Sequence, residues 1–578
     1  MMITGAELFV KALKAERVDT LFAYPGGQAI DLFNALYGEN TINVILPRHE
    51  QGVVHAADGY ARSTGNVGVC LVTSGPGATN LVTGIATANY DSVPLVCFTG
   101  QVPTSLIGND AFQEVDIVGI TRSICKYAVT VRKRDDLATI IKKAFYIART
   151  GKPGVVLVDF PKDIQKEYGS DKYPENIEIR GYKPNTSVHA GQIKKAIDVL
   201  NHGKRPVFLV GGGVNIGHAE SEMLKLAEIT GVPVITTIMG KGAIPTTHDL
   251  YVGNIGIHGS YAANTAINNC DVLFSIGTRF NDRITGKIEQ FASHAVIIHV
   301  DIDSASISRN IAVDIPIVAD AKKAILALIE KAQPLNIREW VEQINDWKKQ
   351  HPITMKDKGI TPKKIIMEIN NIFNKAVITT DVGQNQLWAT QFLELNENKQ
   401  MLTSGGLGTM GYGFPAAIGA KIGNPATDVV VITGDGGMQM NIQEMATAIV
   451  YELPITICIL NNGYLGNVRQ WQEMFFDKRY SSTCMRYRKS CPAACNSPTD
   501  RCPTYTPDFI KLAESYGAKA IRVTDAEEIS SALKTAKETT KVPTIIEFII
   551  EREENVIPIV PPGNALDDMI LESEDNRI

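Results

Sequence analysis

Residues 428–466 constrain the fold most, because they have the pattern of a complete strand–helix–strand unit. Two apolar runs, at 429–433 and 455–460, have the length and composition of buried parallel strands. Between them, Asn441 followed by Glu444 predicts a helix N-cap with its capping-box partner. We therefore expect an open parallel sheet, in which ligands bind at the carboxyl edge.

Polar residues follow both predicted strands at that edge. Asp435 lies in a GDGG run after the first strand, and Asn461 and Asn462 follow the second. The flanking glycines let the backbone approach an anion, which a helix N-terminus favours. A carboxylate would repel a phosphate unless a cation lay between them, so Asp435 and an amide oxygen of Asn462 are expected to bind Mg²⁺. GDGG alone is equally consistent with a structural glycine turn. With the NN pair, the pattern resembles the thiamin diphosphate (ThDP) signature.

The composition is typical of a large soluble enzyme. A chain of 578 residues that is 44% hydrophobic and 21% charged has the size of three or four domains. A net charge of −5 without a long basic run argues against nucleic acid as a partner. We expect no transmembrane helix, and the amphipathic start without a signal or transit segment predicts a cytoplasmic protein. Nine cysteines in this length do not indicate a disulfide framework.

Strand-like and helix-like segments alternate along the chain, which predicts an α/β fold of three doubly wound parallel-sheet domains. The domains are expected at 1–170, 188–345 and 360–555, followed by a tail at 556–578. The charged segment 170–188, and Trp340–Gln350 with the KDKG run after it, are expected to be linkers. The first and third regions have the same order of elements and are predicted to be two copies of one sheet architecture. Predicted strands in the first two regions are residues 20–24, 43–46, 67–72, 94–98, 155–159, 233–237, 272–276 and 295–300.

Glu50 lies just inside the N-terminus of a predicted helix in the first region. A glutamate there is commonly a partner of the helix dipole or a surface charge. The alternative depends on the ThDP assignment, because such an enzyme needs one carboxyl group at N1′ of the aminopyrimidine. That contact stabilises the imino tautomer, whose 4′-nitrogen removes the C2 proton of the thiazolium.

The central region has a weaker sign of a bound dinucleotide. Gly211, Gly212 and Gly213 follow a predicted strand but lack the GxGxxG spacing, so a simple tight turn stays open. The HVDID run ends another strand with acidic residues, as in sites that bind ribose hydroxyls.

Ten motifs carry a resemblance that covers nearly the whole chain. They are YPGGQAIDLF, LPRHEQGVVHAADGYAR, TSGPGATN, GNDAFQEVDIVGITRSICKY, GKPGVVLVDFPKDIQ, FNDRITGK, TSGGLGTMGYGFPAAIGAK, GDGGMQMNIQE, LNNGYLGNVRQWQEMFF and VPPGNALDDMI. With them the chain resembles the catalytic large subunits of the acetolactate synthase (acetohydroxyacid synthase) family, which depend on ThDP. The resemblance implies pyrimidine-binding, central FAD-binding and diphosphate-binding domains.

The resemblance also implies the reaction and the partners. Pyruvate would be decarboxylated, and its two-carbon unit would condense with a second pyruvate or with 2-ketobutyrate. The products, 2-acetolactate and 2-aceto-2-hydroxybutyrate, lead to branched-chain amino acids. A homodimer or homotetramer is implied, with Glu50 of one subunit meeting the Asp435 half of the site in the other. A small regulatory subunit is common in the family.

Roles for individual residues follow from the same resemblance. Glu50 would contact N1′ of the cofactor, while Asp435, Asn462 and the backbone carbonyl of Tyr464 would hold Mg²⁺. Further ThDP contacts would be Gln384, Asn385, Met410 (holding the cofactor bent), Gly436, Gly437 and Met438. Substrate-side residues would be Gly27, Phe112, Gln113, Lys162 at the channel mouth, Arg283 near the second acid's carboxylate, and Trp471, which would favour the bulkier acid. Without the resemblance, Met410 would be an ordinary core methionine and Lys162 a surface lysine.

FAD is implied as a bound cofactor that takes no part in the net reaction. Its implied contacts are Gly211, Gly212, Gly213, Thr236, His258, Gly277, Arg279, Asp282, Asp301, Ile302 and Asp320. The chain departs from the family here, because NIGIHG places Ile257 where many members have a methionine.

A second departure is an insertion that contains four cysteines, Cys484, Cys491, Cys495 and Cys502. Four thiolates suit Zn²⁺ or an iron–sulfur cluster, but no CxxC pair is present. A surface loop with incidental or redox-active thiols is the alternative.

Other functions share this scaffold. Pyruvate oxidases and simple 2-ketoacid decarboxylases share much of it, and a glyoxylate carboligase would be expected to lack Glu50. A FAD-free catabolic acetolactate synthase would differ by its missing flavin. A non-catalytic regulatory paralogue would have lost Glu50 or Asp435, and both are present.

Overall fold

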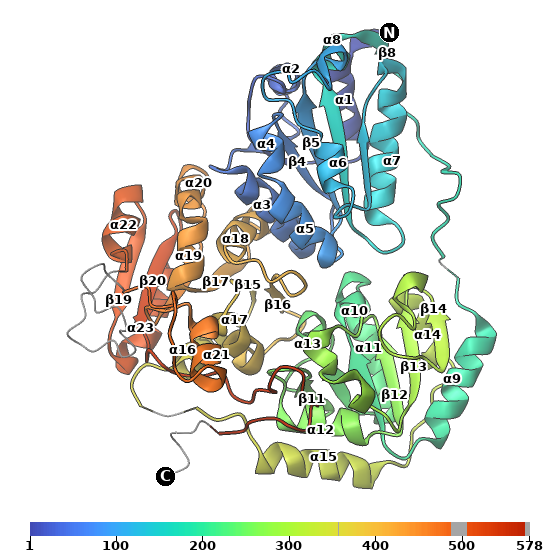
Figure 1. Cartoon of the computed structure of the whole chain (residues 1–578), viewed down its shortest axis with the longest axis vertical. Helices are drawn as coiled ribbons and strands as arrows, with labels where there is room; N and C mark the ends of the chain where they lie inside the picture. Colours follow the sequence, from blue (N-terminus) through green and yellow to red (C-terminus); the bar gives the residue numbers. More distant parts are fainter. Residues whose placement is uncertain (186, 356–357, 487–505, 573–578) are drawn as a thin grey trace.

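Three six-stranded sheets form the framework of the molecule (Figure 1). The computed structural model describes residues 1–578 except 186, 356–357, 487–505 and 573–578. All strand pairs within the three sheets are parallel, and helices cover them. The predicted α/β class with three doubly wound domains is confirmed. In the described part of the chain, no helix is both long and apolar enough to cross a bilayer.

The first sheet has the strand order β3-β2-β4-β5-β7-β6. Its strands are β2 (Thr20–Ala23), β3 (Asn43–Ile45), β4 (Gly68–Val72), β5 (Leu95–Gln101), β6 (Tyr127–Thr130) and β7 (Val155–Pro161). The helices are α1 (Gly5–Ala15), α2 (Ile30–Leu36), α3 (Glu50–Thr64), α4 (Pro76–Thr79), α5 (Val82–Tyr90), α6 (Ile117–Thr121), α7 (Leu137–Arg149) and α8 (Lys162–Lys166). The short strands β1 (Met2–Thr4) and β8 (Tyr168–Ser170) pair antiparallel beside it.

The third sheet repeats this topology, with the order β16-β15-β17-β18-β20-β19. When the strands of each sheet are numbered along the chain, both orders read 2-1-3-4-6-5, which confirms the predicted duplication. The strands are β15 (Ala376–Thr380), β16 (Lys399–Leu402), β17 (Asp428–Gly434), β18 (Thr456–Asn461), β19 (Lys519–Val523) and β20 (Thr544–Ile549). The helices are α16 (Pro362–Ile372), α17 (Gln384–Phe392), α18 (Gly413–Gly423), α19 (Asp435–Met440), α20 (Met445–Val450), α21 (Gly466–Phe475), α22 (Phe509–Tyr516) and α23 (Ile529–Lys537).

The central sheet has a different order, β11-β10-β9-β12-β13-β14. Numbered along the chain it reads 3-2-1-4-5-6, the order typical of dinucleotide-binding folds. Its strands are β9 (Pro206–Val210), β10 (Val234–Thr236), β11 (Tyr251–Asn254), β12 (Val272–Ile276), β13 (Val296–Asp301) and β14 (Ile315–Val318). The helices are α9 (Ala190–His202), α10 (Gly212–Ile216), α11 (Glu220–Thr230), α12 (Tyr261–Asn269), α13 (Asp282–Thr285), α14 (Ala321–Ile329) and α15 (Arg338–Gln350).

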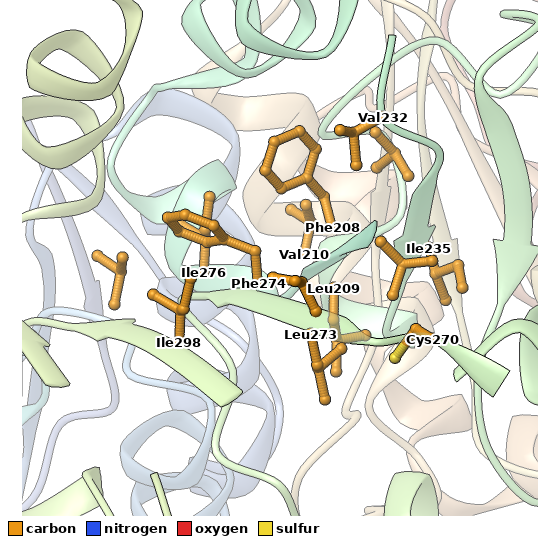
Figure 2. Packing of buried hydrophobic residues seen from close by; sticks show 14 of the residues in the cluster. Phe208, Leu209, Val210, Val232, Ile235, Cys270, Leu273, Phe274, Ile276 and Ile298 are labelled. Atoms are coloured by element: carbon orange, nitrogen blue, oxygen red, sulfur yellow. The ribbon is translucent and has the colours of Figure 1, made fainter. Parts of the chain in front are cut away.

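The core of the central sheet shows why short apolar runs became strands there. β9 and β12 pair in register, and the rings of Phe208 and Phe274 meet edge to face with centroids 5.6 Å apart. Figure 2 shows these rings beside Val210, Leu273 and other apolar residues of neighbouring strands. Since both faces of the sheet are covered, every side chain of the run has an apolar environment.

The segment after the central sheet differs from its prediction. Residues 338–350, expected to be part of a linker, form the helix α15. Trp340 and Ile344 are buried one turn apart, and the indole of Trp340 packs edge to face on that of Trp347. The apolar spacing was present in the sequence, but the many charged residues between these positions concealed it. The expectation of a linker was wrong for this stretch.

The chain returns to the central domain after the third sheet. The backbone N–H of Val560 donates to the carbonyl of Ile257, and Val560 and Leu566 join the central core. Figure 1 shows the C-terminal segment running from the third domain back along the central one. The described part of the predicted tail, residues 556–572, is thus attached to the domain that precedes the third sheet in sequence.

The first and third domains meet through α3 and α18 (Figure 1). Gly59 of α3 lies on the backbone carbonyl of Ala416, and Gly419 of α18 lies on that of Ala56. A Cβ at either glycine would overlap the facing carbonyl group. The two helices can approach this closely only because both positions lack side chains.

Candidate active site

A small pocket of about 70 Å³ opens at the carboxyl edge of the third sheet, where β15, β17 and β18 end. β17 and β18 are neighbours, with Gly434 paired to Leu460, so the polar residues that follow the two strands meet at this edge as predicted. Eight of the predicted cofactor and metal residues line the pocket. They are Gln384, Asn385, Met410, Asp435, Gly436, Gly437, Asn462 and Tyr464.

Asp435 is the first residue of α19 and is almost fully buried. Its Oδ2 atom has no hydrogen-bond partner among the described residues. Burial raises the pKa of this carboxyl group to about 7. A buried carboxylate oxygen that lacks a partner is costly, and a divalent cation is the partner that would satisfy it. The residues present therefore fit Mg²⁺.

Asn462 faces the same pocket and is fixed by two contacts. Its Oδ1 accepts the backbone N–H of Tyr464 at 3.0 Å, and its Nδ2 donates to Gln384 Oε1 at 3.3 Å. The other member of the NN pair turns elsewhere, since Asn461 Nδ2 donates to Glu547 Oε1 at 2.7 Å. Of the two asparagines, Asn462 lines the pocket and Asn461 does not.

Asp381 is a residue that sequence reasoning missed. It follows β15 and accepts the backbone N–H of Gly411 at 3.0 Å and that of Gly413 at 3.2 Å. These amides flank the turn after Met410. Burial raises the pKa of Asp381 to about 6. The signal that could have identified it was an acidic residue at a predicted strand end, in TTDVGQ.

Two positions at the pocket accommodate only glycine, because any side chain there would clash with a neighbouring residue. A Cβ on Gly437 would lie 2.5 Å from Asp381 Oδ1, and one on Gly466 would overlap the side-chain amide of Gln384. Met438 differs from its neighbours, because its side chain is buried in the apolar core of the third domain. Its predicted contact with the cofactor could therefore involve only its backbone.

The predicted capping box at Asn441 and Glu444 was wrong. No side chain caps the turn that starts at Asn441, whose Nδ2 instead donates to the carbonyl of Gly411 at 2.7 Å. Glu444 turns to the first domain and accepts the backbone N–H of His49 at 3.1 Å. The local pattern was correct for an N-cap, but the side chain of Asn441 contacts a distant turn of its own domain and that of Glu444 contacts the first domain.

The predicted residues of the first domain lie at the carboxyl edge of its own sheet. Glu50 opens α3 and accepts from Asn80 Nδ2 at 2.9 Å. Lys162 Nζ donates to the carbonyl of Gly27, which joins two of the predicted substrate residues. Gln113 has a positive φ of 60°, and the side chain of Phe112 is 85% exposed. Among the described residues, none from the first domain lines the pocket at Asp435.

Trp471 and Arg283 also lie away from that pocket. Trp471 belongs to α21, next to the pocket-lining turn, and packs edge to face on Phe475. Arg283 lies in α13 of the central domain, where it pairs with Asp282 at 3.3 Å. Within one chain, the predicted substrate residues therefore fall on three separate surfaces.

A cavity of about 1150 Å³ lies at the junction of the three domains, over the carboxyl edge of the central sheet. Its wall includes the turns after β9 and β12, where the strand order of the sheet reverses. Gly213 fits against Gly277 so closely that a Cβ would lie 2.7 Å from Gly277 Cα. Predicted FAD residues in the wall are Gly212, Gly213, Gly277, Arg279, Asp301, Ile302 and Asp320.

The other predicted FAD residues do not line the cavity. Gly211 is the N-cap of α10, and Thr236 is buried and receives a hydrogen bond from Asn254. His258 contacts the carbonyl of Pro558 at 3.2 Å, and burial lowers its pKa to about 4. Asp282 lies beside Arg283, which does line the wall. The strand order and the glycine turns fit a dinucleotide.

Of the four cysteines in the predicted insertion, one lies within the described residues. Cys491, Cys495 and Cys502 lie outside the described residues, and Cys484 is a partly buried free thiol. Among the described residues, no group of three or more His, Cys, Asp or Glu side chains could hold a metal ion.

Comparisons with known proteins define the class. Three thiamine pyrophosphate enzyme models match the chain: the N-terminal TPP binding domain at residues 3–120, the central domain at 193–328 and the C-terminal TPP binding domain at 381–548. Together with the site they define a thiamine pyrophosphate-dependent enzyme.

The relatives define the family more narrowly. The probable acetolactate synthase large subunit of Methanococcus aeolicus is 46% identical over 98% of this chain and 95% of the relative. The acetolactate synthase isozyme 3 large subunit of Escherichia coli is 42% identical, and 99% of each chain is covered. The acetolactate synthase large subunit of Cyanidium caldarium is 43% identical over 98% of this chain and 96% of the relative. The chain belongs to the acetolactate synthase large subunit family, as its motifs predicted.

Proposed function

We propose that this chain catalyses the acetolactate synthase reaction, in which one pyruvate is decarboxylated and its two-carbon unit is joined to a second 2-ketoacid. The observation that carries the proposal is the pocket at the end of β17 and β18. There the unsatisfied Oδ2 of Asp435 lies with Asn462 beneath a glycine-rich helix start. Family membership supplies the reaction type.

Mg²⁺ would be held by Asp435, by Asn462 Oδ1 and by the backbone carbonyl of Tyr464. Backbone amides of Gly436, Gly437 and Met438 would bind the diphosphate at the start of α19, where the helix dipole favours an anion. Gln384 and Asn385 would complete this side of the pocket. When bound, ThDP would supply the carbon nucleophile and the electron sink for decarboxylation.

Glu50 would hold the proton at N1′ of the aminopyrimidine. Its Oε2 atom accepts a hydrogen bond from Asn80 Nδ2 at 2.9 Å, and the residue follows β3 at the carboxyl edge of the first sheet. Met410 would support the bent cofactor, because its loop is anchored by Asp381 on one side. The enclosed walls would exclude water at the stage where a stray proton would divert the reaction to acetaldehyde.

A second copy of the chain would complete the site. Glu50 and the Asp435 pocket lie in different domains, and Phe112 at the first-domain edge is 85% exposed. In a homodimer or homotetramer, Glu50 of one subunit would face the pocket of the other, with Gly27, Gln113 and Lys162 on the substrate side. A small regulatory subunit would be a further partner, and the cytoplasm the compartment.

FAD would occupy the cavity at the domain junction without a part in the net reaction. The support is the 3-2-1-4-5-6 strand order and the contact of Gly213 with Gly277. Purified protein is expected to show a flavin absorption spectrum. Gly213→Val should abolish it, since a larger side chain would meet the backbone of Gly277. A colourless wild-type protein reconstituted with FAD would remove the flavin from the proposal.

The test of the main proposal is acetolactate formation from pyruvate with ThDP and Mg²⁺. Glu50→Gln is expected to lower kcat by about 10²- to 10⁴-fold. Glu39→Gln is the control in the same domain and should leave kcat unchanged, because the partners of that carboxylate are Lys14 and Thr41. Near-full turnover in Glu50→Gln, or no acetolactate from the wild type, would refute the proposal.

The choice of the second 2-ketoacid can be tested separately, by measuring the ratio of the two products. Trp471 would set the preference of the pocket for the bulkier second acid, 2-ketobutyrate, with Arg283 near the carboxylate of that acid. Trp471→Leu is expected to shift the ratio of 2-aceto-2-hydroxybutyrate to 2-acetolactate towards the latter when both acids compete. An unchanged ratio would exclude Trp471 from substrate choice.

A further inference from the structure

Glu444 lies in the third domain, but its carboxylate binds the first. The residue is fully buried at the end of the short 3₁₀ turn Ile442–Glu444. Both of its oxygens accept the backbone N–H of Arg48 at 3.0 Å, and Oε1 also accepts that of His49 at 3.1 Å. The hydroxyl of Thr447 donates to Oε2 at 2.6 Å. Among the described residues, every hydrogen bond that this carboxylate accepts from the first domain thus comes from the two residues before Glu50.

These two residues form the entry to α3. His49 is the N-cap of the helix, and its ring Nδ1 accepts the backbone N–H of Gln51 at 3.0 Å. Amides at a helix start have no partner inside the helix, so external acceptors decide how firmly the first turn is held. A carboxylate is also the charge that the helix dipole favours there. Glu444 therefore holds the turn on which Glu50 is placed.

Gly52 makes room for this contact on the helix itself. A Cβ at that position would lie 2.5 Å from Glu444 Oε1 and 2.8 Å from its Cδ. The carboxylate is therefore enclosed between the loop before α3 and the first turn of α3. In this position it limits the movement of both.

Tyr451 provides a comparison within the same interface. Its hydroxyl accepts the backbone N–H of Leu46 at 2.8 Å and donates to the carbonyl of Val44 at 3.3 Å. Tyr451 thus joins the same two domains but contacts only the chain further upstream of α3. Loss of its hydroxyl weakens the interface without releasing the first helical turn.

We propose that Glu444 is a positioning residue that sets the place of Glu50 from the third domain of the same chain. The inference rests on the proposed function, in which Glu50 holds the N1′ proton. Glu444 ends the segment that starts with Asp435, so one short stretch of chain connects the predicted metal side of the pocket to the loop before Glu50. Glu444 itself does not line the pocket at Asp435.

The test is the exchange of the C2 proton of enzyme-bound ThDP for deuterium, measured with Glu444→Gln. The glutamine side chain has one acceptor oxygen where glutamate has two, so it cannot keep all the hydrogen bonds from the backbone N–H groups of Arg48 and His49. The first turn of α3 should therefore shift. Exchange is expected to slow by about 10- to 100-fold, the effect of misplacing a catalytic group by about 1 Å. ThDP affinity and the KM for pyruvate should stay within about threefold, because the pocket residues are unaltered.

A second readout uses the protein without cofactor. Backbone amide exchange of the peptide around residues 46–54 should be faster in Glu444→Gln than in the wild type, while that of β17 stays the same. Tyr451→Phe is the matched control, since it should lower thermal stability but leave C2 proton exchange unchanged. Equal slowing in both variants would mean that the interface only stabilises the fold, and it would overturn the proposal.

A double-mutant cycle separates a role through Glu50 from an independent one. If Glu444 acts through Glu50, the variant Glu50→Gln/Glu444→Gln should exchange no more slowly than Glu50→Gln alone. Additive effects would overturn the inference.

If Glu444→Gln fails to fold, Gly52→Ala displaces the same carboxylate from the helix side and should slow exchange in the same way. If Glu50→Gln exchanges the C2 proton at the wild-type rate, the proposed function is refuted. If exchange is slow in Glu50→Gln but has the wild-type rate in Glu444→Gln, only the present inference is refuted.

Discussion

The hydroxyl of Tyr412 donates a 2.6 Å hydrogen bond to Asp58 Oδ1 across the contact of the third and first domains. Arg62 pairs with the same carboxylate at 2.7 Å and with Asp91 at 2.9 Å. Asp91 in turn accepts the backbone N–H of Gly406 at 2.8 Å. One buried network thus links α3, the end of α5 and the glycine loop before Met410. Charges buried in this way are stable only while every member keeps its partners.

Tyr412→Phe is therefore expected to destabilise the protein without altering its surface. The change leaves Asp58 buried with one partner fewer, which costs about 1–3 kcal/mol. Calorimetry of the cofactor-free protein should show a lower thermal midpoint. Tyr37→Phe, at a side chain that is 92% exposed, is the control. Equal midpoints for the two variants would contradict the network's role.

Gly59→Ala and Gly419→Ala should each separate α3 from α18. The added methyl group would overlap a backbone carbonyl, which no rotamer change can relieve. We expect a loss of about 3 kcal/mol or more in the free energy of unfolding, measured by denaturant titration. Gly191→Ala in the exposed first turn of α9 is the control, because its Cβ would meet only the ring of His189. Wild-type stability in both interface variants would mean that the helices pack less closely than described.

Asp435→Asn should affect the cofactor-free and the cofactor-bound protein in opposite directions. Without Mg²⁺ and ThDP, the thermal midpoint should rise, because a buried carboxylate oxygen without a partner is removed. With both ligands at about 100 times their Kd, the wild type should gain about 2.7 kcal/mol, and the variant should gain almost nothing.

Asp428→Asn is the control for Asp435→Asn, at the other end of β17. Asp428 pairs with Lys537 at 3.6 Å and is 37% exposed, so this variant should keep the ligand-induced shift. An Asp435→Asn protein that still gains stability from Mg²⁺ and ThDP would remove Asp435 as a ligand.

Lys241→Met should change how stability depends on pH. Burial lowers the pKa of Lys241 to about 7, and its Nζ donates to the carbonyl of Thr390 at 2.8 Å. Between the folded pKa near 7 and the ordinary lysine pKa of 10.5, the unfolded chain binds a proton that the folded chain does not. The contribution of this lysine to stability therefore rises with pH, by up to about 1.4 kcal/mol per unit.

The measurement compares unfolding of wild type and variant at several pH values from neutral to alkaline. The difference in stability, wild type minus Lys241→Met, should increase as the pH rises. Lys194→Met, at an exposed position of α9, should leave the slope of the wild type unchanged. A pH-independent difference for Lys241→Met would show that this lysine is already charged in the folded protein.

The sequence by itself determined the strands and their edges. Apolar runs such as 429–433 and 455–460, short and bounded by turn residues, have the length and composition of strands in a covered parallel sheet. A short crossover then places their carboxyl ends side by side. Asp435 and Asn462 thus met at one edge, as the pattern predicted. The duplicated topology also followed from the order of elements alone.

Two local patterns failed for the same physical reason. The N-cap pattern at Asn441 and the apparent linker at α15 were judged from neighbouring residues only. In the folded chain, Asn441 contacts the carbonyl of Gly411, and Trp340 is buried against the central domain. Contacts with distant segments replaced the local choice in both cases.

Tertiary structure alone decided how the domains meet. Glu444 binds the amide of Arg48 and Tyr412 binds Asp58 across the domain contact, and within the third domain Asp381 holds the amide of Gly411. The spacing of residues in the sequence does not predict these pairs. It indicates which face of a helix or strand a residue occupies, but not which distant segment packs against that face. The carboxylates of Glu444 and Asp381 look like ordinary polar residues in the sequence. They became structural partners only when burial removed water and left distant backbone amides as their hydrogen-bond donors.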